Sequence, residues 1–280
     1  GYELWIKLTQ KHKVDNINLP LFYYRQHGKN LTSDNAKILK TRCDIIRKES
    51  SQSQDSKNIN WCVIPIRADS DLIPLALRKI KETTLVDIAI EQALVASQVN
   101  HIIVTTNDKR VYDHLSDRNY HSRVIVDLRP DSIALPNVAI EETVKYLLEK
   151  FSESLFRPHI IAIANYEYPL RDPKYLDKLI DVINLFKADS SLSVTTRTGN
   201  LYKHEGSGLA DFTTNRQLRL ERESVYEDCG GLHAFKTDMF LDTGKLMGQK
   251  VTHILMDEIS SNKVDSVLSL EVAELLFGKK

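Results

Sequence analysis

The chain has 280 residues, enough for one large domain or for a domain with an appendage, and enough to bury a core that needs no disulfide. Lysine plus arginine and aspartate plus glutamate both number 38, so the formal net charge is +0 and no global field draws the chain to nucleic acid or anionic lipid. No stretch approaches the roughly 20 apolar residues that span a bilayer. The cysteines, Cys43, Cys62 and Cys229, lack metal-ligand spacing and fit reduced thiols, which favours a cytoplasmic protein.

The N-terminal part of the sequence is predicted to form an appendage followed by a linker. Glu3 to Leu8 is typical of an amphipathic helix, and Asn18 to Arg25 is typical of a short strand entered through a proline. The run from Arg47 to Asn58 is too poor in apolar residues to bury itself. The predicted division is an appendage at 1–46, a polar linker at 47–60 and a domain at 61–280.

After the linker, short apolar runs alternate with helical patterns, which predicts crossover connections between parallel strands. The expected fold class is α/β, a doubly wound, mostly parallel sheet with helices on both faces. Ligands of such sheets bind at the carboxyl ends of the strands. The predicted strands are Cys62–Ile66, Ile102–Thr105, Val124–Val126, Ile160–Ala164, Leu192–Thr195, Leu232–Phe235 and Val251–Leu255. The predicted helices are Leu85–Ala96, Ile140–Phe151, one that opens at Asp172-Pro173, and Leu270–Phe277.

Several short blocks follow the predicted strands in a recognisable order. They are Ile64–Ala76, Thr105–Asp108, Arg129-Pro130, Ala164–Arg171, Tyr226–Phe235 and Lys263–Asp265 with Ala273-Glu274. In this order they resemble the blocks of the cytidylyltransferases that make CMP-sialic acid and CMP-Kdo, and of related sugar nucleotidyltransferases. The resemblance covers about Trp61 to Lys280. It implies a nucleotide-diphospho-sugar transferase (Rossmann-like) fold and CTP-dependent activation of a sialic-acid-type or Kdo-type sugar, with Mg²⁺ as cofactor and a homodimer as the assembly.

The segment that matches the family's phosphate loop departs from its pattern. The family has I-P-A-R-x-G-S-x-R-x-P-G-K, and this chain keeps Arg67, Ser70 and Pro74 but not the glycines, the second arginine or the lysine. Glycine lets the backbone approach phosphate closely and adopt positive φ. Leu75-Ala76 stands in place of Gly-Lys, which removes both the close approach and a phosphate-binding charge. We therefore expect this loop to hold a triphosphate poorly.

The resemblance and the residue chemistry together give a set of candidate site residues. Arg67 and Ser70 are the candidate catalytic residues, because a cationic side chain and a hydroxyl can contact phosphate. Arg171 is the candidate clamp for a substrate carboxylate, with an ordinary surface arginine as the alternative. The candidate nucleotide-binding residues are Arg67, Ser70, Arg129 and Asn165.

Simpler readings of these residues remain open. Arg67 could pair with Asp69 or Asp71 instead of a ligand. Ser70 could cap a helix. Asn165 could cap the buried strand before it through its amide and carbonyl.

The candidate metal ligand is Asp265, because Mg²⁺ prefers carboxylate oxygens. Lys263 stands where the family has the first aspartate of its D-I-D block. An ammonium group at that position either weakens metal binding or neutralises phosphate or Asp265 in the metal's place.

The appendage resembles a second family. Tyr2–Leu8 and Leu19–His27 are similar to the closing segment of inverting GT-A glycosyltransferases, whose catalytic carboxylate lies upstream of such a segment. That carboxylate would fall before Gly1, so no activity is carried over. The resemblance implies a glycosyltransferase fused to a cytidylyltransferase-like domain in surface-polysaccharide synthesis.

Three hypotheses follow. The first is an active or weakly active cytidylyltransferase whose partners are CTP and an acidic sugar. The second is a catalytically silent binding or dimerisation module. The third is a module that binds a CMP-sugar and hands it to the fused transferase.

Overall fold

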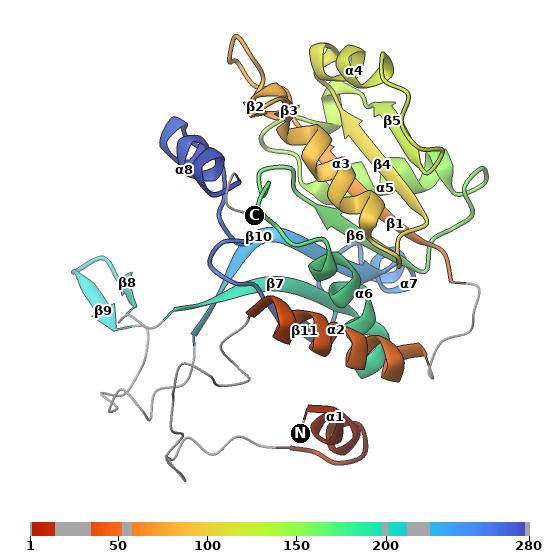
Figure 1. Cartoon of the computed structure of the whole chain (residues 1–280), viewed down its shortest axis with the longest axis vertical. Coiled ribbons are helices and arrows are strands. Elements are labelled where there is room, and N and C mark those ends of the chain that lie inside the picture. Colours follow the sequence, from red (N-terminus) through yellow and green to blue (C-terminus); the bar gives the residue numbers. More distant parts are fainter. Residues whose placement is uncertain (1, 15–34, 52–57, 198–200, 212–224, 278–280) are drawn as a thin grey trace.

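A seven-stranded sheet forms the centre of the molecule (Figure 1), in a computed structural model that describes residues 2–14, 35–51, 58–197, 201–211 and 225–277. Its strands are β1 Asn60–Ile66, β4 His101–Thr106, β5 Val124–Leu128, β6 Ile160–Ala164, β7 Ser190–Arg197, β10 Val225–Lys236 and β11 Val251–Leu255. Their order across the sheet is β11-β7-β10-β6-β1-β4-β5. Two short pairs lie outside this sheet, β2 Lys79–Ile80 with β3 Thr83–Thr84, and β8 Tyr202–His204 with β9 Leu209–Asp211.

Most neighbouring strands of the sheet run parallel. β1 pairs in parallel with β4 and β6, β4 with β5, and β11 with β7, whereas β10 is antiparallel to both β6 and β7. The expected α/β, mostly parallel sheet is therefore confirmed. All the strands predicted after the linker are present, and β10 begins at Val225 instead of the predicted Leu232.

The helices cover both faces of the sheet (Figure 1). They are α1 Tyr2–Lys11, α2 Asn35–Ser51, α3 Leu85–Val95, α4 Lys109–Ser116, α5 Ile140–Phe151, α6 Lys174–Phe186, α7 Thr237–Thr243 and α8 Val267–Phe277. The helices predicted from the sequence after the linker correspond to α3, α5, α6 and α8, and α4 and α7 were missed. Single 3-10 turns, η1 and η2, occupy Leu75–Leu77 and Asp131–Ile133.

Successive side chains of β1 enter two separate cores. Cys62 and Ile64 pack in the core shared with α3 and α6, whereas Trp61 and Val63 pack in the core shared with α5 and α7. Because a strand presents alternate side chains to opposite faces, a sheet covered on both sides needs apolar residues at nearly every position of its central strands. This requirement explains why the strands read as continuous apolar runs in the sequence.

The N-terminal helices pack against the same domain. Ile6 of α1 and Ile46 of α2 are buried in the core that includes α6, and α2 lies along α6 (Figure 1). The amphipathic helix predicted at Glu3 to Leu8 is confirmed as α1. The strand predicted at Asn18 to Arg25 lies outside the described residues.

The predicted start of the linker was wrong, because α2 continues to Ser51. Glu49 and Ser50 are buried, and the Arg47 guanidinium lies 2.7 Å from the Asp177 carboxylate. Ser50 Oγ donates to Asp181 Oδ1 at 3.3 Å. Arg47 and Ser50 thus contact the carboxylates of α6, and the Glu49 carboxylate lies 3.6 Å from the Lys7 ammonium of α1. The division into an appendage and a domain stays a prediction.

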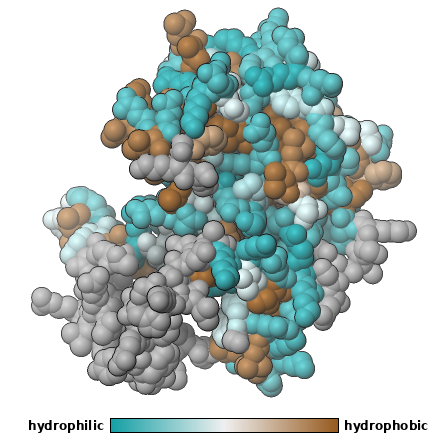
Figure 2. All heavy atoms as spheres, in the orientation of Figure 1, coloured by the Kyte–Doolittle hydropathy of each residue, from teal (hydrophilic) through white to brown (hydrophobic). Residues whose placement is uncertain are grey.

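The surface is mostly hydrophilic on the face shown in Figure 2, with smaller hydrophobic areas between the polar side chains. Within the described ranges, no helix combines the length and the apolar content that crossing a bilayer requires.

Candidate functional site

The candidate nucleotide-binding residues lie where four neighbouring strands end. Arg67 and Ser70 follow β1, Arg129 follows β5 and Asn165 follows β6, while Asn107 follows β4 between them. Since these four strands are adjacent and parallel, their carboxyl ends form one edge of the sheet. The structure thus brings the predicted segments to the same edge.

The loop after β1 is organised around an internal carboxylate. Asp69 Oδ1 accepts a hydrogen bond from the backbone N–H of Asp71 at 3.1 Å, and Asp69 Oδ2 accepts one from the N–H of Leu75 at 2.9 Å. Asp69 stands at the first glycine of the family's loop pattern. Backbone N–H groups of such a loop are the donors that a phosphate would use. A negative side chain of the protein is already bonded to two of them.

Arg110 of α4 also holds the loop after β1. It was not among the candidate residues predicted from the sequence. Its guanidinium donates to the carbonyl oxygen of Asp71 at 2.8 Å and to that of Asp69 at 3.2 Å. It also bonds both oxygens of Asp108, at 3.0 Å and 2.6 Å, and these bonds lower the pKa of Asp108. In the sequence, the one indication of this role is that an arginine stands two residues after Asp108, the cap of α4. Only the fold shows that this arginine reaches the loop after β1.

Arg67 and Ser70 are exposed on this loop. The Arg67 guanidinium makes one long contact, 3.5 Å, to the carbonyl oxygen of Val138. The simple reading in which Arg67 pairs with Asp69 or Asp71 does not match the structure, because both carboxylates contact other arginines. Within the described residues the Ser70 hydroxyl has no hydrogen-bond partner, so nothing supports a capping role. Both side chains could reach a ligand.

Arg129 is buried, with 5 % of its surface exposed. It donates to the carbonyl oxygen of Thr105 at 3.2 Å and to that of Ile66 at 3.0 Å. Burial lowers the pKa of Arg129 to about 10, and the positive charge of Arg67 acts in the same direction. Arg129 therefore ties the ends of β1 and β4 together, and its nucleotide-binding role stays a prediction.

Arg171 is also buried, with 3 % of its surface exposed, so it is not an ordinary surface arginine. It donates to the carbonyl oxygens of Gly231, at 2.9 Å, and Asn165, at 3.2 Å, and to Gln92 Oε1 at 2.9 Å. Burial lowers the pKa of Arg171 to about 10. These three acceptors occupy the donors that would clamp a substrate carboxylate, a role that stays a prediction.

Asn165 bonds to the neighbouring strand β10. Its side-chain amide donates to the carbonyl oxygen of Gly230, and its backbone N–H donates to that of Gly231 at 3.2 Å. Gly230 has φ +70°, a conformation that favours glycine, and lies in the irregular stretch of β10. The bonds agree with a residue that caps β6, and they leave the Asn165 carbonyl side-chain oxygen as its potential contact to a base or sugar.

The segment expected to hold Mg²⁺ has a poor donor set. Asp265 is exposed, and its Oδ1 accepts from Ser269 Oγ at 3.4 Å. Lys263 lies 3.3 Å from the Glu167 carboxylate, so its ammonium neutralises Glu167 instead of Asp265. No group of three or more acidic, histidine or cysteine side chains is placed to hold a metal ion in the part of the chain that the structure describes. These residues do not fit a magnesium site, and the use of Mg²⁺ stays a prediction.

The fold closely follows that of known cytidylyltransferases. A CMP:2-keto-3-deoxy-manno-octonic acid synthetase complexed with CTP superposes with a TM-score of 0.57 over 79 % of this chain and 99 % of that chain, at 13 % identity. A 4-diphosphocytidyl-2C-methyl-D-erythritol synthase from Anaerococcus prevotii gives 0.56 over 83 % and 98 %, at 12 % identity. A 2-C-methyl-D-erythritol 4-phosphate cytidylyltransferase from Francisella tularensis gives 0.57 over 78 % and 99 %, at 11 % identity.

This chain has the cytidylyltransferase fold. The identities are too low to carry an activity across, and the sequence matches no family model and no curated protein. The superpositions cover 98–99 % of the length of each of these three structures. Function has to be argued from the site.

Proposed function

We propose that this chain is a cytidylyltransferase-fold protein that no longer performs nucleotidyl transfer and serves as a binding module. The observation that carries the proposal is the Asp69 carboxylate bonded to the N–H groups of Asp71 and Leu75. A triphosphate placed against these amides would have to displace an anion that is covalently part of the loop. Arg110 strengthens this arrangement by holding the loop carbonyls.

The other charged residues near the carboxyl ends of these strands also favour binding over catalysis. Arg129 donates to two backbone carbonyl oxygens, and Arg171 donates to two others and to Gln92 Oε1. Lys263, two residues before Asp265, pairs with Glu167. Transfer of a nucleotidyl group requires that charge developing on the phosphates be stabilised by fixed cations or a metal. Among the candidate cations Arg67 has the weakest contact with the protein, one of 3.5 Å to the Val138 carbonyl oxygen, and a single available cation favours binding over catalysis.

An active cytidylyltransferase is the second candidate, and one observation favours it. Arg67 and Ser70 are exposed on the loop at the carboxyl edge of β1, where ligands of such sheets bind. Under this proposal the substrates would be CTP and an acidic sugar of the sialic-acid or Kdo type. A glycosyltransferase fused before residue 46, a homodimer, a cytoplasmic location and a role in surface polysaccharide belong to the same family-based proposal.

The deciding experiment incubates the chain with CTP, Mg²⁺ and a panel of acidic sugars and measures pyrophosphate. We expect no release above the rate without protein. Sugar-dependent release that disappears in Arg67→Ala and Ser70→Ala, but persists in the exposed control Lys245→Ala, would overturn the proposal.

Calorimetric titration separates the remaining alternatives. A silent binding module is expected to bind CTP weakly and without dependence on Mg²⁺. Tighter binding of a CMP-sugar than of CTP would identify the module as one that receives the activated product.

A further inference from the structure

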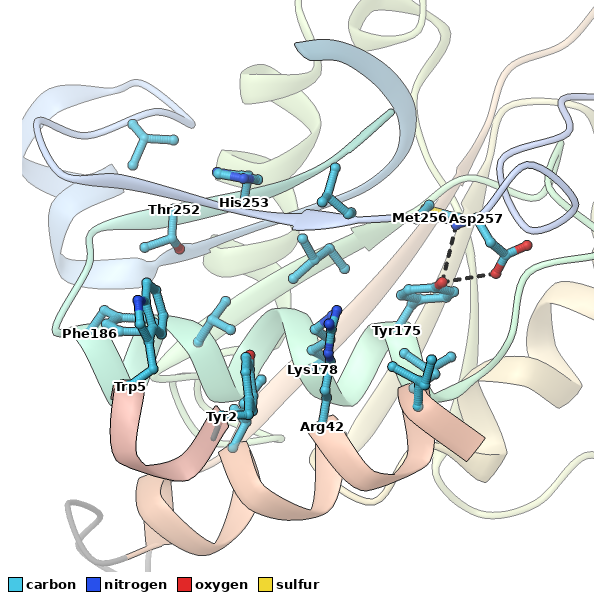
Figure 3. A pocket seen from close by; sticks show the side chains of 17 residues that line it. Tyr2, Trp5, Arg42, Tyr175, Lys178, Phe186, Thr252, His253, Met256 and Asp257 are labelled. Carbon is cyan, nitrogen blue, oxygen red and sulfur yellow. Dashed lines mark hydrogen bonds between the residues drawn. The ribbon is translucent and has the colours of Figure 1, made fainter. Parts of the chain in front are cut away.

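A cavity lies beside β11, the outermost strand on one side of the sheet, away from the loop after β1. It has a volume of about 660 Å³ and lies between α1, α2, α6 and the edge strand β11 (Figure 3). Strands β7, β10 and β6 separate β11 from β1. The cavity is therefore independent of the candidate nucleotide site, and its size is that of a pocket for a small organic molecule.

The cavity contains a buried ammonium group without an acidic partner. Lys178 on α6 is 9 % exposed, and in the described residues it makes no ion pair and no hydrogen bond through its side chain. Its nearest favourable contact is the ring of Tyr175, whose centroid lies 5.9 Å from Nζ. Asp181, one turn further along α6, is already bonded by Arg47 and Ser50. Charged side chains are rarely buried without a partner, so an unmatched lysine here indicates that a ligand supplies the partner.

A second cation lines the same space. Arg42 on α2 also lines the cavity, and its guanidinium carbon lies 5.4 Å from the centre of the Tyr2 ring. The described structure gives it no ion pair. Burial lowers the pKa of Lys178, and the positive charge of Arg42 acts in the same direction. Two like charges that face one cavity favour an anion between them.

The acidic side chain at the end of the cavity does not neutralise these cations. The Asp257 carboxylate accepts from the Tyr175 hydroxyl at 2.9 Å and from the backbone N–H of Ser260 at 2.8 Å. Burial opposes ionisation of Asp257, but these hydrogen bonds outweigh it and lower its pKa. The Asp257 carboxylate is thus bonded to the wall of the cavity and does not pair with the two cations. The part of the cavity that Arg42 and Lys178 line therefore stays positively charged.

The rest of the lining is aromatic and apolar. Tyr2 and Trp5 stack with their ring centroids 6.4 Å apart and 12° between their planes, and Phe186 lies across from them on α6 (Figure 3). Trp5 remains 50 % exposed, so its ring has a free face. Thr252 of β11 also lines the cavity, and its hydroxyl donates to the carbonyl oxygen of Ser190 at 3.3 Å. Planar apolar groups pack well against such rings.

We propose that this cavity binds a small organic anion, with its carboxylate or phosphate between Arg42 and Lys178 and a planar apolar body against Trp5 and Phe186. The shared chemistry is one anionic group on a flat hydrophobic frame. The proposal is independent of whether the loop at Asp69 binds a nucleotide.

The test titrates the purified full chain with benzoate and phenyl phosphate, and with benzamide and inorganic phosphate as probes that lack the charge or the ring. Binding is followed by calorimetry and by tryptophan fluorescence, which reports on Trp5 because the other tryptophan, Trp61, is fully buried in a different core. We expect the two aromatic anions to bind at least about tenfold more tightly than either control probe. The ratio between benzoate and phenyl phosphate identifies the preferred headgroup.

Variants separate a ligand site from a structural lysine. Lys178→Met keeps the aliphatic stem and removes the charge, and Arg42→Gln changes an exposed position of α2. Each is expected to weaken the binding of the aromatic anions at least about tenfold, while the exposed control Lys245→Met after α7 leaves their affinity unchanged. Without ligand, Lys178→Met is expected to raise the Tm by ~2–4 °C because it removes an unpaired buried charge.

Two results would overturn the proposal. The first is equal or absent binding of all four probes to the unaltered chain. The second is a lower Tm for Lys178→Met together with unchanged probe affinity in Arg42→Gln, since Lys178 would then stabilise the fold by itself.

Discussion

Removing the charge of Asp69 should make the loop after β1 accept a phosphate. In Asp69→Asn the side chain keeps one acceptor oxygen for the two loop amides and loses its negative charge. A phosphate on these amides would lie next to the carboxylate. At a separation of about 4 Å, two unit charges repel by ~1 kcal/mol in water and by ~4 kcal/mol at the effective dielectric of a protein surface. Relief of this repulsion predicts CTP binding at least about tenfold tighter than in the unaltered chain.

The same substitution carries a structural cost that can be measured separately. One of the two loop hydrogen bonds is lost, which costs ~1 kcal/mol and lowers the Tm by ~2–4 °C. Asp69→Gly loses both hydrogen bonds, so its Tm is expected to fall further, although the substitution restores the glycine of the family pattern. The assay is calorimetric titration with CTP, and the matched control is Asp242→Asn, which makes the same change of charge at an exposed position of α7.

The reasoning about the loop would be refuted by a CTP affinity in Asp69→Asn that stays within twofold of both the unaltered chain and Asp242→Asn. A gain equal to that of the control would show only a general effect of net charge. A gain confined to Asp69→Asn would show that the carboxylate occupies the phosphate position.

The remaining predictions concern buried charges. Arg171→Met should lower the free energy of unfolding by ~2–4 kcal/mol in urea denaturation, because the buried carbonyl oxygens of Gly231 and Asn165 lose their donor; a loss under 1 kcal/mol would contradict this. Burial raises the pKa of Asp181 to about 6, so the folded state holds its proton more tightly than the unfolded state and stability falls as pH rises from about 4 to about 6. Asp181→Asn should therefore raise the free energy of unfolding by ~1–3 kcal/mol at pH 8 and leave it unchanged at pH 4. An equal change at both pH values would contradict this explanation. Arg47→Met should destabilise by ~1–3 kcal/mol at pH 8, and less at pH 4.5 where Asp181 is protonated, as checked by thermal melts at both pH values.

The central layers were predictable because each local signal agrees with the fold. The run Cys62 to Ile66 was predicted as a buried strand because it is short, apolar and rich in β-branched residues, and it forms most of β1. The helix that follows Asp172-Pro173 showed its buried face at Leu176, Leu179 and Ile183, all of which are buried. Patterns of this kind depend on backbone geometry alone.

The polar contacts could not be predicted from the sequence, because they depend on which polar groups the fold brings together. Glu49 and Ser50 belong to a run that looks like a linker, but carboxylates and an arginine more than 100 residues apart make it part of a packed helix. Arg171 had the same sequence context as a surface arginine, yet three acceptors from separate segments bury it. The absence of glycine predicted a weakened loop, whereas the bonding of Asp69 to the loop amides could be seen only in the folded structure.

The packing of α2 on α6 also determines how this protein can be divided for experiments. Val182 and Tyr175 of α6 are almost fully buried, and Ile46 of α2 belongs to the same core. A fragment that begins at residue 58 would turn this apolar strip outward, and exposed strips of that kind promote self-association. The shortest fragment expected to stay monodisperse for this reason begins at residue 35 and retains α2 as the cover of α6.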